Sequence, residues 1–291
     1  MADTTSMLTL IYDQAATKFG QDYHPEHPAR LINTEAYLLD KRPDWVWMQP
    51  RVATEEEVFR AHRPKHLERL RQPLDFDSDT PYYPGIEEHA RRAAGAAICA
   101  VDIALRGKKA FALMRPPGHH ATSTEAMGFC YLNSIAIAAH HALATGCERV
   151  GIWDFDAHHG NGTEEIVFGN KRIRFTSVHQ YPGYPGTGTM SRGNVFNWPI
   201  APNSDSQEHA SAVHHALDHL VDFNPDVLLV SAGFDAFAGD PLTEMTLERE
   251  HFADFGRQLG ATGLQAAAVL EGGYSTDLPT LVEAFLAAWS D

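Results

Sequence analysis

The stretch Val150-Gly-Ile-Trp-Asp-Phe-Asp-Ala-His-His-Gly-Asn-Gly162 decides the fold, because an apolar run leads directly into a polar turn rich in glycine. Short apolar runs between turn signals are typical of strands buried in a parallel sheet. Four further runs end in the same way, at residues 110–114, 173–178, 227–231 and 267–270. The carboxyl ends of the strands form the ligand crevice of an open α/β sheet. We therefore expect the five turns to converge on one site.

The rest of the chain alternates short apolar runs with longer amphipathic segments. Further strands are predicted at residues 8–12, 46–48 and 195–200. Helical periodicity marks residues 30–39, 55–70, 86–105, 133–144, 208–221, 247–259 and 281–289. This alternation predicts βαβ units and an α/β fold with a mainly parallel sheet flanked by helices. No linker or internal repeat divides the 291 residues, so one domain spanning 1–291 is predicted.

The composition narrows the class of protein. Hydrophobic residues make up 44% of the chain and charged residues 21%, which is ordinary globular usage. The net charge of −15 argues against nucleic-acid binding and favours cationic partners. No apolar run is long enough to span a membrane, and residues 1–6 lack the features of a signal peptide. We expect a cytoplasmic protein that does not bind membranes.

Cysteine and histidine usage indicates which residue types could bind a metal ion in this chain. The three cysteines, Cys99, Cys130 and Cys147, form no C-x-x-C pair, which argues against a disulfide framework or a zinc finger. The 17 histidines, by contrast, invite a search for metal ligands. His140-His141 and His214-His215 lie inside amphipathic segments, and we interpret these pairs as structural.

Asp156, His158 and Asp235 are the candidate metal ligands. Asp156 and His158 lie two residues apart at a strand end, so their side chains leave the same face. Asp235 comes from the end of another predicted strand and would complete a set of three nitrogen and oxygen ligands. Three protein ligands with an open fourth position are typical of catalytic zinc.

His119 and His120 follow Pro-Pro-Gly at a third strand end, where proton-transfer groups are expected. A neutral imidazole beside a metal can take a proton from water and return it to a leaving amine. Such histidines need partners that fix the tautomer, and Asp154 and Asn161 are candidates. Tyr274, in a Gly-Gly-Tyr turn, can donate a hydrogen bond to a developing oxyanion.

Several motifs in this order resemble the zinc-dependent histone deacetylase superfamily. They are Arg115-Pro-Pro-Gly-His-His-Ala121, Gly128-Phe-Cys-Tyr-Leu-Asn133, Asp154-Phe-Asp-Ala-His-His-Gly-Asn-Gly-Thr163, Ala232-Gly-Phe-Asp-Ala236 with Gly239-Asp-Pro241, and Glu271-Gly-Gly-Tyr274. The resemblance extends from about His24-Pro-Glu-His-Pro28 to the C-terminus. It implies the arginase/deacetylase fold, with an eight-stranded, mainly parallel sheet in one catalytic domain.

The resemblance also implies a role for each matching residue. One zinc ion would be bound by Asp156, His158 and Asp235. His120 matches the general base and acid, and His119 matches its electrostatic neighbour. Asp154 matches the partner of His119, Asn161 matches the partner of His120, and Tyr274 matches the residue that polarises the acyl carbonyl. An inner potassium site would use Asp154, Phe155, Asp156, His158, Ser177 and Val178.

The substrate tunnel follows from the same resemblance. Gly128, Phe129 and Tyr184 should line it, Leu242 should lie near its rim, and Asp79 should bind the backbone amides of the substrate. Two departures stand out. Asn161 occupies a position where some branches carry Asp, which together with the histidine motif resembles the class II and bacterial branch, and Tyr184 replaces a common Phe.

The expected activity is hydrolysis of an acyl-amide, with acetyl-lysine or another short acyl-lysine in proteins or peptides as substrate. The main alternative is an acetylpolyamine, although Leu242 stands where polyamine specialists of one branch carry an acidic gatekeeper. Such an acid can also come from another loop or a dimer partner, so this reading stays open. A dinuclear manganese ureohydrolase is disfavoured because Gly160 replaces a bridging carboxylate. A catalytically silent acyl-lysine reader is the remaining alternative. Oligomeric state and acyl-chain preference are left open.

Overall fold

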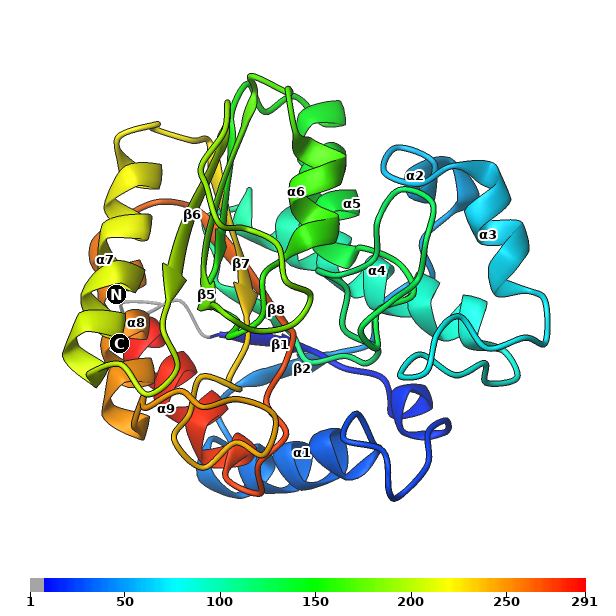
Figure 1. Cartoon of the computed structure of the whole chain (residues 1–291), viewed down its shortest axis with the longest axis horizontal. Coiled ribbons are helices and arrows are strands. Elements are labelled where there is room, and N and C mark those ends of the chain that lie inside the picture. The colour runs from blue at the N-terminus through cyan, green and yellow to red at the C-terminus, as the bar shows by residue number, and fades with distance from the viewer. Residues whose placement is uncertain (1–7) are drawn as a thin grey trace, which may run out of the picture.

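Eight strands form one sheet in the computed structural model of the chain, which describes residues 8–291 (Figure 1). The strands lie in the order β2-β1-β3-β8-β7-β4-β5-β6, and every neighbouring pair is parallel. Their bounds are β1 Thr9–Ile11, β2 Val46–Met48, β3 Ala110–Ala112, β4 Val150–Asp154, β5 Ile173–Gln180, β6 Val195–Ile200, β7 Val227–Ala232 and β8 Ala266–Leu270. This confirms the predicted eight-stranded α/β fold of the arginase/deacetylase type. The prediction that residues 1–6 do not form a signal peptide concerns residues that lie outside the described part of the chain.

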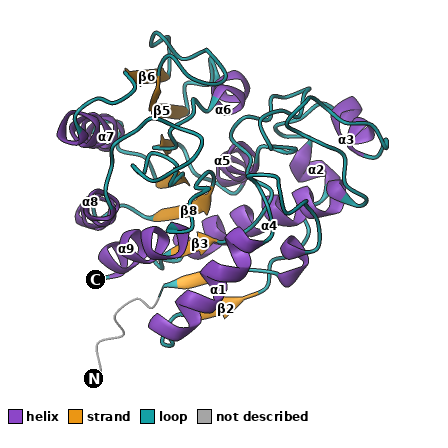
Figure 2. Ribbon diagram, turned by 60° about the horizontal axis from the view of Figure 1, so that its bottom comes forward, coloured by secondary structure: helices purple, strands orange, loops and turns teal. Residues whose placement is uncertain are grey.

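Helices cover both faces of the sheet (Figure 2). One face carries α4 Ile86–Ala104, α5 Ser134–Ala144 and α6 Asn161–Val167. The other carries α1 Ala29–Lys41, α7 Ser206–Val221, α8 Arg249–Ala261 and α9 Leu278–Ser290. The short helices α2 Glu55–Val58 and α3 Pro64–Leu70 pack against α5 and α4, and the 3-10 helix η1 Gln14–Thr17 precedes α1. No helix within residues 8–291 has the length and apolar character needed to cross a membrane.

Two helical segments differ from the prediction. The single helix predicted over residues 55–70 is wrong, because the chain forms α2 and α3 with a break between them. Pro64 lacks a backbone N–H, and the preceding Arg63 is extended, with φ −76° and ψ 144°. Helix α6 was not predicted, because it begins at Asn161-Gly162, two poor helix formers.

The polar residues outside the crevice behave as the sequence suggested. Cys99, Cys130 and Cys147 are free thiols. In the histidine pairs of α5 and α7, His141 Nε2 lies 2.9 Å from the Asp102 carboxylate, and His214 Nε2 lies 3.0 Å from Asp254. Both are contacts between packed helices, as expected for structural histidines.

An aromatic cluster fixes the segment that leaves β4. The Phe155 ring is fully buried, with its centroid 5.5 Å from those of Phe255 on α8 and Phe285 on α9. Burial of such a side chain stabilises the fold by roughly 1.5–3 kcal/mol. Side chains alternate along an extended segment, so anchoring Phe155 in the core directs Asp154 and Asp156 to the opposite side. The core packing therefore presents both acids to the crevice.

The strand register brings the five polar turns together. The strands that precede them, β3, β8, β7, β4 and β5, are adjacent in the sheet. Their ends are nearly level, because Asp154 pairs with Ser177 on one side and with Ser231 on the other, and Ser231 pairs with Val269. The predicted convergence of the turns is thus a consequence of strand order.

Candidate active site

Asp156, His158 and Asp235 form a cluster at the base of the crevice. One ligand atom from each lies within 4.8 Å of the others, and both carboxylates are fully buried. Backbone groups orient the acids. Asp156 Oδ1 accepts from the N–H of His158 (2.9 Å), Asp156 Oδ2 accepts from Gly272 (2.7 Å), and Asp235 Oδ1 accepts from Ala157 (2.8 Å). Loops following three different strands therefore build one site.

The electrostatics of this cluster favour a cation. Burial of His158 disfavours its charged form, yet Asp235 and Asp156 outweigh this and raise the pKa of the ring to about 10. Burial and the neighbouring Asp156 charge also raise the pKa of Asp235. One imidazole and two carboxylates are a donor set that suits zinc, and three protein ligands leave a position open. The residues present thus fit the metal that the resemblance implies.

The two adjacent histidines meet the partners predicted for them. His119 Nδ1–H donates to Asp154 Oδ2 (3.0 Å), and His120 Nδ1–H donates to Asn161 Oδ1 (2.8 Å). The Asn161 amide nitrogen lies 3.4 Å from both the His120 carbonyl and Met127 Sδ, which leaves its oxygen for the His120 ring. The two imidazole centroids are 4.1 Å apart.

The two rings differ in charge preference. Although burial opposes it, the carboxylates of Asp156 and Asp154 raise the pKa of His119. For His120, burial and the neighbouring rings of His119 and His158 lower the pKa well below its usual value. His120 is therefore neutral near pH 7, with Nδ1 protonated and the Nε2 lone pair free to accept a proton.

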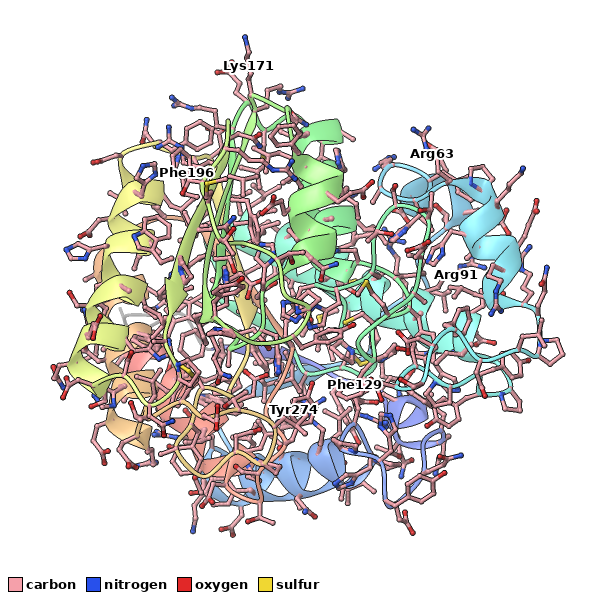
Figure 3. The ribbon with its side chains drawn as sticks, in the orientation of Figure 1. Arg63, Arg91, Phe129, Lys171, Phe196 and Tyr274 are labelled. Carbon is pink, nitrogen blue, oxygen red and sulfur yellow. The ribbon has the colours of Figure 1, made fainter. Side chains whose placement is uncertain are left out.

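Tyr274 lies on the turn that follows β8, beside the tunnel residue Phe129 (Figure 3). The two ring centroids are 5.7 Å apart in an edge-to-face arrangement, and the Arg30 guanidinium lies 4.7 Å from the Tyr274 centroid. Burial raises the pKa of Tyr274 well above its usual range. The hydroxyl therefore stays protonated and can donate a hydrogen bond.

A cavity of about 460 Å³ leads down to these groups. It is lined by Tyr23, His24, Pro25, Ser78, Asp79, His120, Gly128, Phe129, His158, Tyr184, Leu242 and Tyr274. All five residues predicted for the tunnel and its rim are in this set. The Tyr184 ring meets His120 edge-on, with centroids 5.1 Å apart. Gly128 has φ +54°, and a Cβ atom there would lie 2.6 Å from the His120 ring and 2.9 Å from Tyr184. Only glycine leaves this wall open.

Two residues that shape the site, Glu271 and His24, were not among the predicted site residues. Glu271 is fully buried and accepts from the N–H groups of Gly118 (2.7 Å) and His119 (3.2 Å), so it orients the histidine turn. His24 connects two parts of the rim, because its Nε2–H donates to the Asp79 carbonyl (3.1 Å) and its ring contacts Phe129. Both residues lie within the quoted motifs, but their roles depend on contacts between distant parts of the chain.

The predicted potassium ligands also lie together. Asp154, Phe155, Ser177 and Val178 are fully buried, and Asp154 and Ser177 are register partners on β4 and β5. Ser177 Oγ is hydrogen bonded to His179 Nδ1 (2.9 Å). The inner potassium site stays a prediction.

Comparisons with known proteins identify the family to which this chain is related. Residues 24–289 match the sequence model of the histone deacetylase domain. A probable deacetylase of Archaeoglobus fulgidus is 35% identical over 87% of this chain and 77% of its own length. Acetylpolyamine amidohydrolase 2 of Pseudomonas aeruginosa is 32% identical over 86% of this chain and 78% of its own. The crystal structure of the HDA15 HD domain superimposes with a TM-score of 0.89 at 32% identity, covering 99% of this chain and 88% of that one.

The fold and these relatives together define a hydrolase of the deacetylase and amidohydrolase class. The chain belongs to the histone deacetylase family, whose domain it matches over nearly its whole length.

Proposed function

We propose that the chain is a zinc-dependent amidohydrolase that removes an acetyl or other short acyl group from the side-chain amine of lysine in peptides or proteins. The observation that carries the proposal is the convergence of a neutral His120, a protonated Tyr274 and the cluster of Asp156, His158 and Asp235 at the base of one cavity. Only this group of three or more metal-ligating side chains is present in residues 8–291, which supports a single ion.

The aromatic walls suit an acylated amine on an aliphatic chain. Phe129 and Tyr184 line the cavity together with the open face of Gly128, so the methylene groups of a lysine side chain can pack between rings. An uncharged amide carries no ammonium into this buried region. Asp79 at the mouth offers a carboxylate to substrate N–H groups.

Asp156, His158 and Asp235 would hold the zinc ion, which when bound would supply Lewis-acid polarisation and activate a water molecule. His120 Nε2 takes a proton from the attacking water as the C–O bond forms, and gives it to the departing amine as the C–N bond breaks. Asn161 fixes the tautomer that leaves Nε2 free, and its neutral amide does not add a second negative charge. Tyr274 donates its hydroxyl to the carbonyl oxygen as negative charge develops there.

Acetylpolyamines are the second candidate substrates, because one relative carries the name acetylpolyamine amidohydrolase at 32% identity. Leu242 adds an apolar contact for a peptide at one side of the rim, whereas the Asp79 carboxylate at the mouth also attracts a polycation. Acidic residues contributed to this rim by a second copy of the chain would favour polyamine substrates.

The decisive experiment screens the zinc-loaded protein against acetyl-lysine peptides, longer acyl-lysine peptides and acetylated polyamines. Each substrate is also tested for equilibrium binding, with Tyr274→Phe as the catalytic variant. Tyr12→Phe is the matched control, because its hydroxyl donates to Glu35 (2.6 Å) outside the cavity lining. We expect peptide hydrolysis, an approximately 10²–10³-fold fall in kcat for Tyr274→Phe, and an unchanged control. Binding of acyl-lysine peptides without hydrolysis of any substrate would instead identify a reader.

A further inference from the structure

Asp240 is a buried carboxylate to which the mechanism above gives no role. Only 7% of the residue is exposed. Its Oδ2 atom accepts from the backbone N–H of Tyr274 (2.7 Å), and Oδ1 accepts from the backbone N–H of Leu242 (3.0 Å). One side chain therefore joins the turn that carries the catalytic tyrosine to the rim of the cavity.

The neighbourhood of Asp240 is part of the same assembly. In the turn that it begins, Thr243 Oγ–H donates to the backbone carbonyl of Asp235 (2.5 Å), a residue of the metal cluster. The turn is thus bonded both to the segment that presents a metal ligand and to the segment that presents Tyr274. The bond to the Asp235 segment is made by Thr243 and not by the Asp240 carboxylate.

The Tyr274 turn is fixed from two sides. Arg30 Nε–H donates to the carbonyl of Gly273 (2.7 Å), and its Nη2–H donates to the carbonyl of Glu271 (2.5 Å). Asp240 binds the next peptide N–H, at Tyr274 itself. Arg30 also lies against the Tyr274 ring, so its contacts constrain both the ring and the preceding backbone. The carboxylate of Asp240 adds a third hydrogen bond to this turn, at the backbone N–H of Tyr274 itself.

A buried carboxylate is costly unless its oxygens are satisfied. A residue that only filled space here could be apolar. The two N–H groups that Asp240 binds belong to residues that line the cavity, on segments 32 positions apart in the sequence. A carboxyl group offers two oxygens, so one side chain holds both N–H groups and resists displacement of the tyrosine turn.

We propose that Asp240 is a positioning residue for amide hydrolysis: its carboxylate sets the backbone of Tyr274, and through it the hydroxyl that meets the substrate carbonyl, relative to the rim at Leu242. This role rests on the proposed function. Asp240 is not among the residues that line the cavity, and its carboxylate bonds to the backbone of Tyr274 and Leu242, so it acts through Tyr274.

The kinetic test is a double-mutant cycle. Misplacement of a reacting group by about 1 Å can cost about 100-fold in rate, so we expect Asp240→Ala to lower kcat by about that factor with little change in KM. In a Tyr274→Phe background the hydroxyl is already absent, and Asp240→Ala should cost about threefold or less. Asp240→Asn keeps the shape and one acceptor, and serves if the Ala variant does not fold.

Asp226→Ala is the matched control. Asp226 also accepts from two backbone N–H groups, of Glu148 (2.6 Å) and Arg149 (2.9 Å), but it lies outside the cavity lining. We expect wild-type kcat and zinc content in this variant. Zinc content should also be unchanged in Asp240→Ala, because Asp240 is not among the clustered ligands.

Hydrogen exchange provides a readout that does not depend on activity. In Asp240→Ala, peptides covering residues 240–243 and 272–275 should exchange faster, whereas the Asp226 variant should leave them unchanged. Equal fold-losses of kcat in both backgrounds, or unchanged exchange at Tyr274, would overturn the positioning role while leaving the proposed hydrolysis intact. An inactive wild-type protein would overturn the proposed function, and the positioning role with it.

Discussion

Zinc should raise the thermal stability of the protein by an amount that can be worked out from the site and the chain length. Asp156 and Asp235 are fully buried in loops that follow separate strands, so the complete ligand set exists only in the folded state. At a free zinc concentration about 1000 times Kd, binding adds about 4.1 kcal/mol to the free energy of unfolding. An unfolding entropy of about 2.1 cal/mol/K per residue gives about 0.6 kcal/mol/K for the 291 residues, so Tm should rise by about 7 °C.

Replacing one ligand should remove this shift. Asp235→Asn leaves one imidazole and one carboxylate. If zinc binding weakens about 1000-fold, or roughly 4.1 kcal/mol, the same free zinc lies near Kd and the rise in Tm falls below about 1 °C. Asp254→Asn is the matched control, since Asp254 also pairs with a histidine, His214 (3.0 Å), on α7 and α8. It should keep the full shift.

The assay is differential scanning calorimetry of chelator-treated protein in a zinc buffer, with bound metal measured in parallel. A wild-type Tm that does not respond to zinc would refute the assignment of the metal site. So would an equal shift in the Asp235 variant. A requirement for two equivalents of manganese would refute the single-ion site.

Three further predictions concern proton transfer, the tunnel wall and acid stability. His120→Ala should lower kcat by about 10²–10⁴-fold and His119→Ala by less, because His120 is the neutral imidazole whose Nε2 atom can accept a proton. Steady-state kinetics giving the reverse order would exchange their roles. Gly128→Ala should weaken hydrolysis and peptide binding together, since its Cβ would lie 2.6 Å from the His120 ring, and wild-type titration curves would contradict this. His209 is fully buried, and burial lowers its pKa from 6.5 to about 4, so its contribution to stability is complete above pH 6.5 and is lost as the pH falls toward 4. In urea titrations, the free energy of unfolding should fall by about 2 kcal/mol less between pH 7.5 and 5 in His209→Leu than in the wild type. An unchanged pH dependence would show that His209 is not the group that titrates.

The sequence predicted the parts of the site that follow directly from a strand end. The sequence was enough to predict Asp156, His158 and Asp235, because a parallel sheet places the ends of its strands along one edge. It was also enough to predict Asp154 and Asn161, because they lie in the same motif as two of the metal ligands. Their distances to His119 and His120 then agreed with the expected pairs.

The residues that support the site could not be predicted in the same way. Arg30 reaches the Glu271 and Gly273 carbonyls across more than two hundred positions, and nothing in the local pattern of α1 distinguishes it from a surface arginine. Asp240 and Glu271 act through backbone N–H groups, which every sequence contains. Pro64 was visible, but the amphipathic pattern on either side of it masked the break between α2 and α3.

The position of β8 has a consequence for how the molecule is assembled during synthesis. This strand follows all the others in the sequence, yet it lies between β3 and β7 near the middle of the sheet. Until it has emerged from the ribosome, no strand forms hydrogen bonds with both the group β2-β1-β3 and the group β7-β4-β5-β6. Asp156 also lacks the Gly272 N–H that orients its carboxylate. A nascent chain can thus carry all three clustered ligands and still have no finished site, so metal capture should coincide with the last step of folding rather than guide the earlier ones.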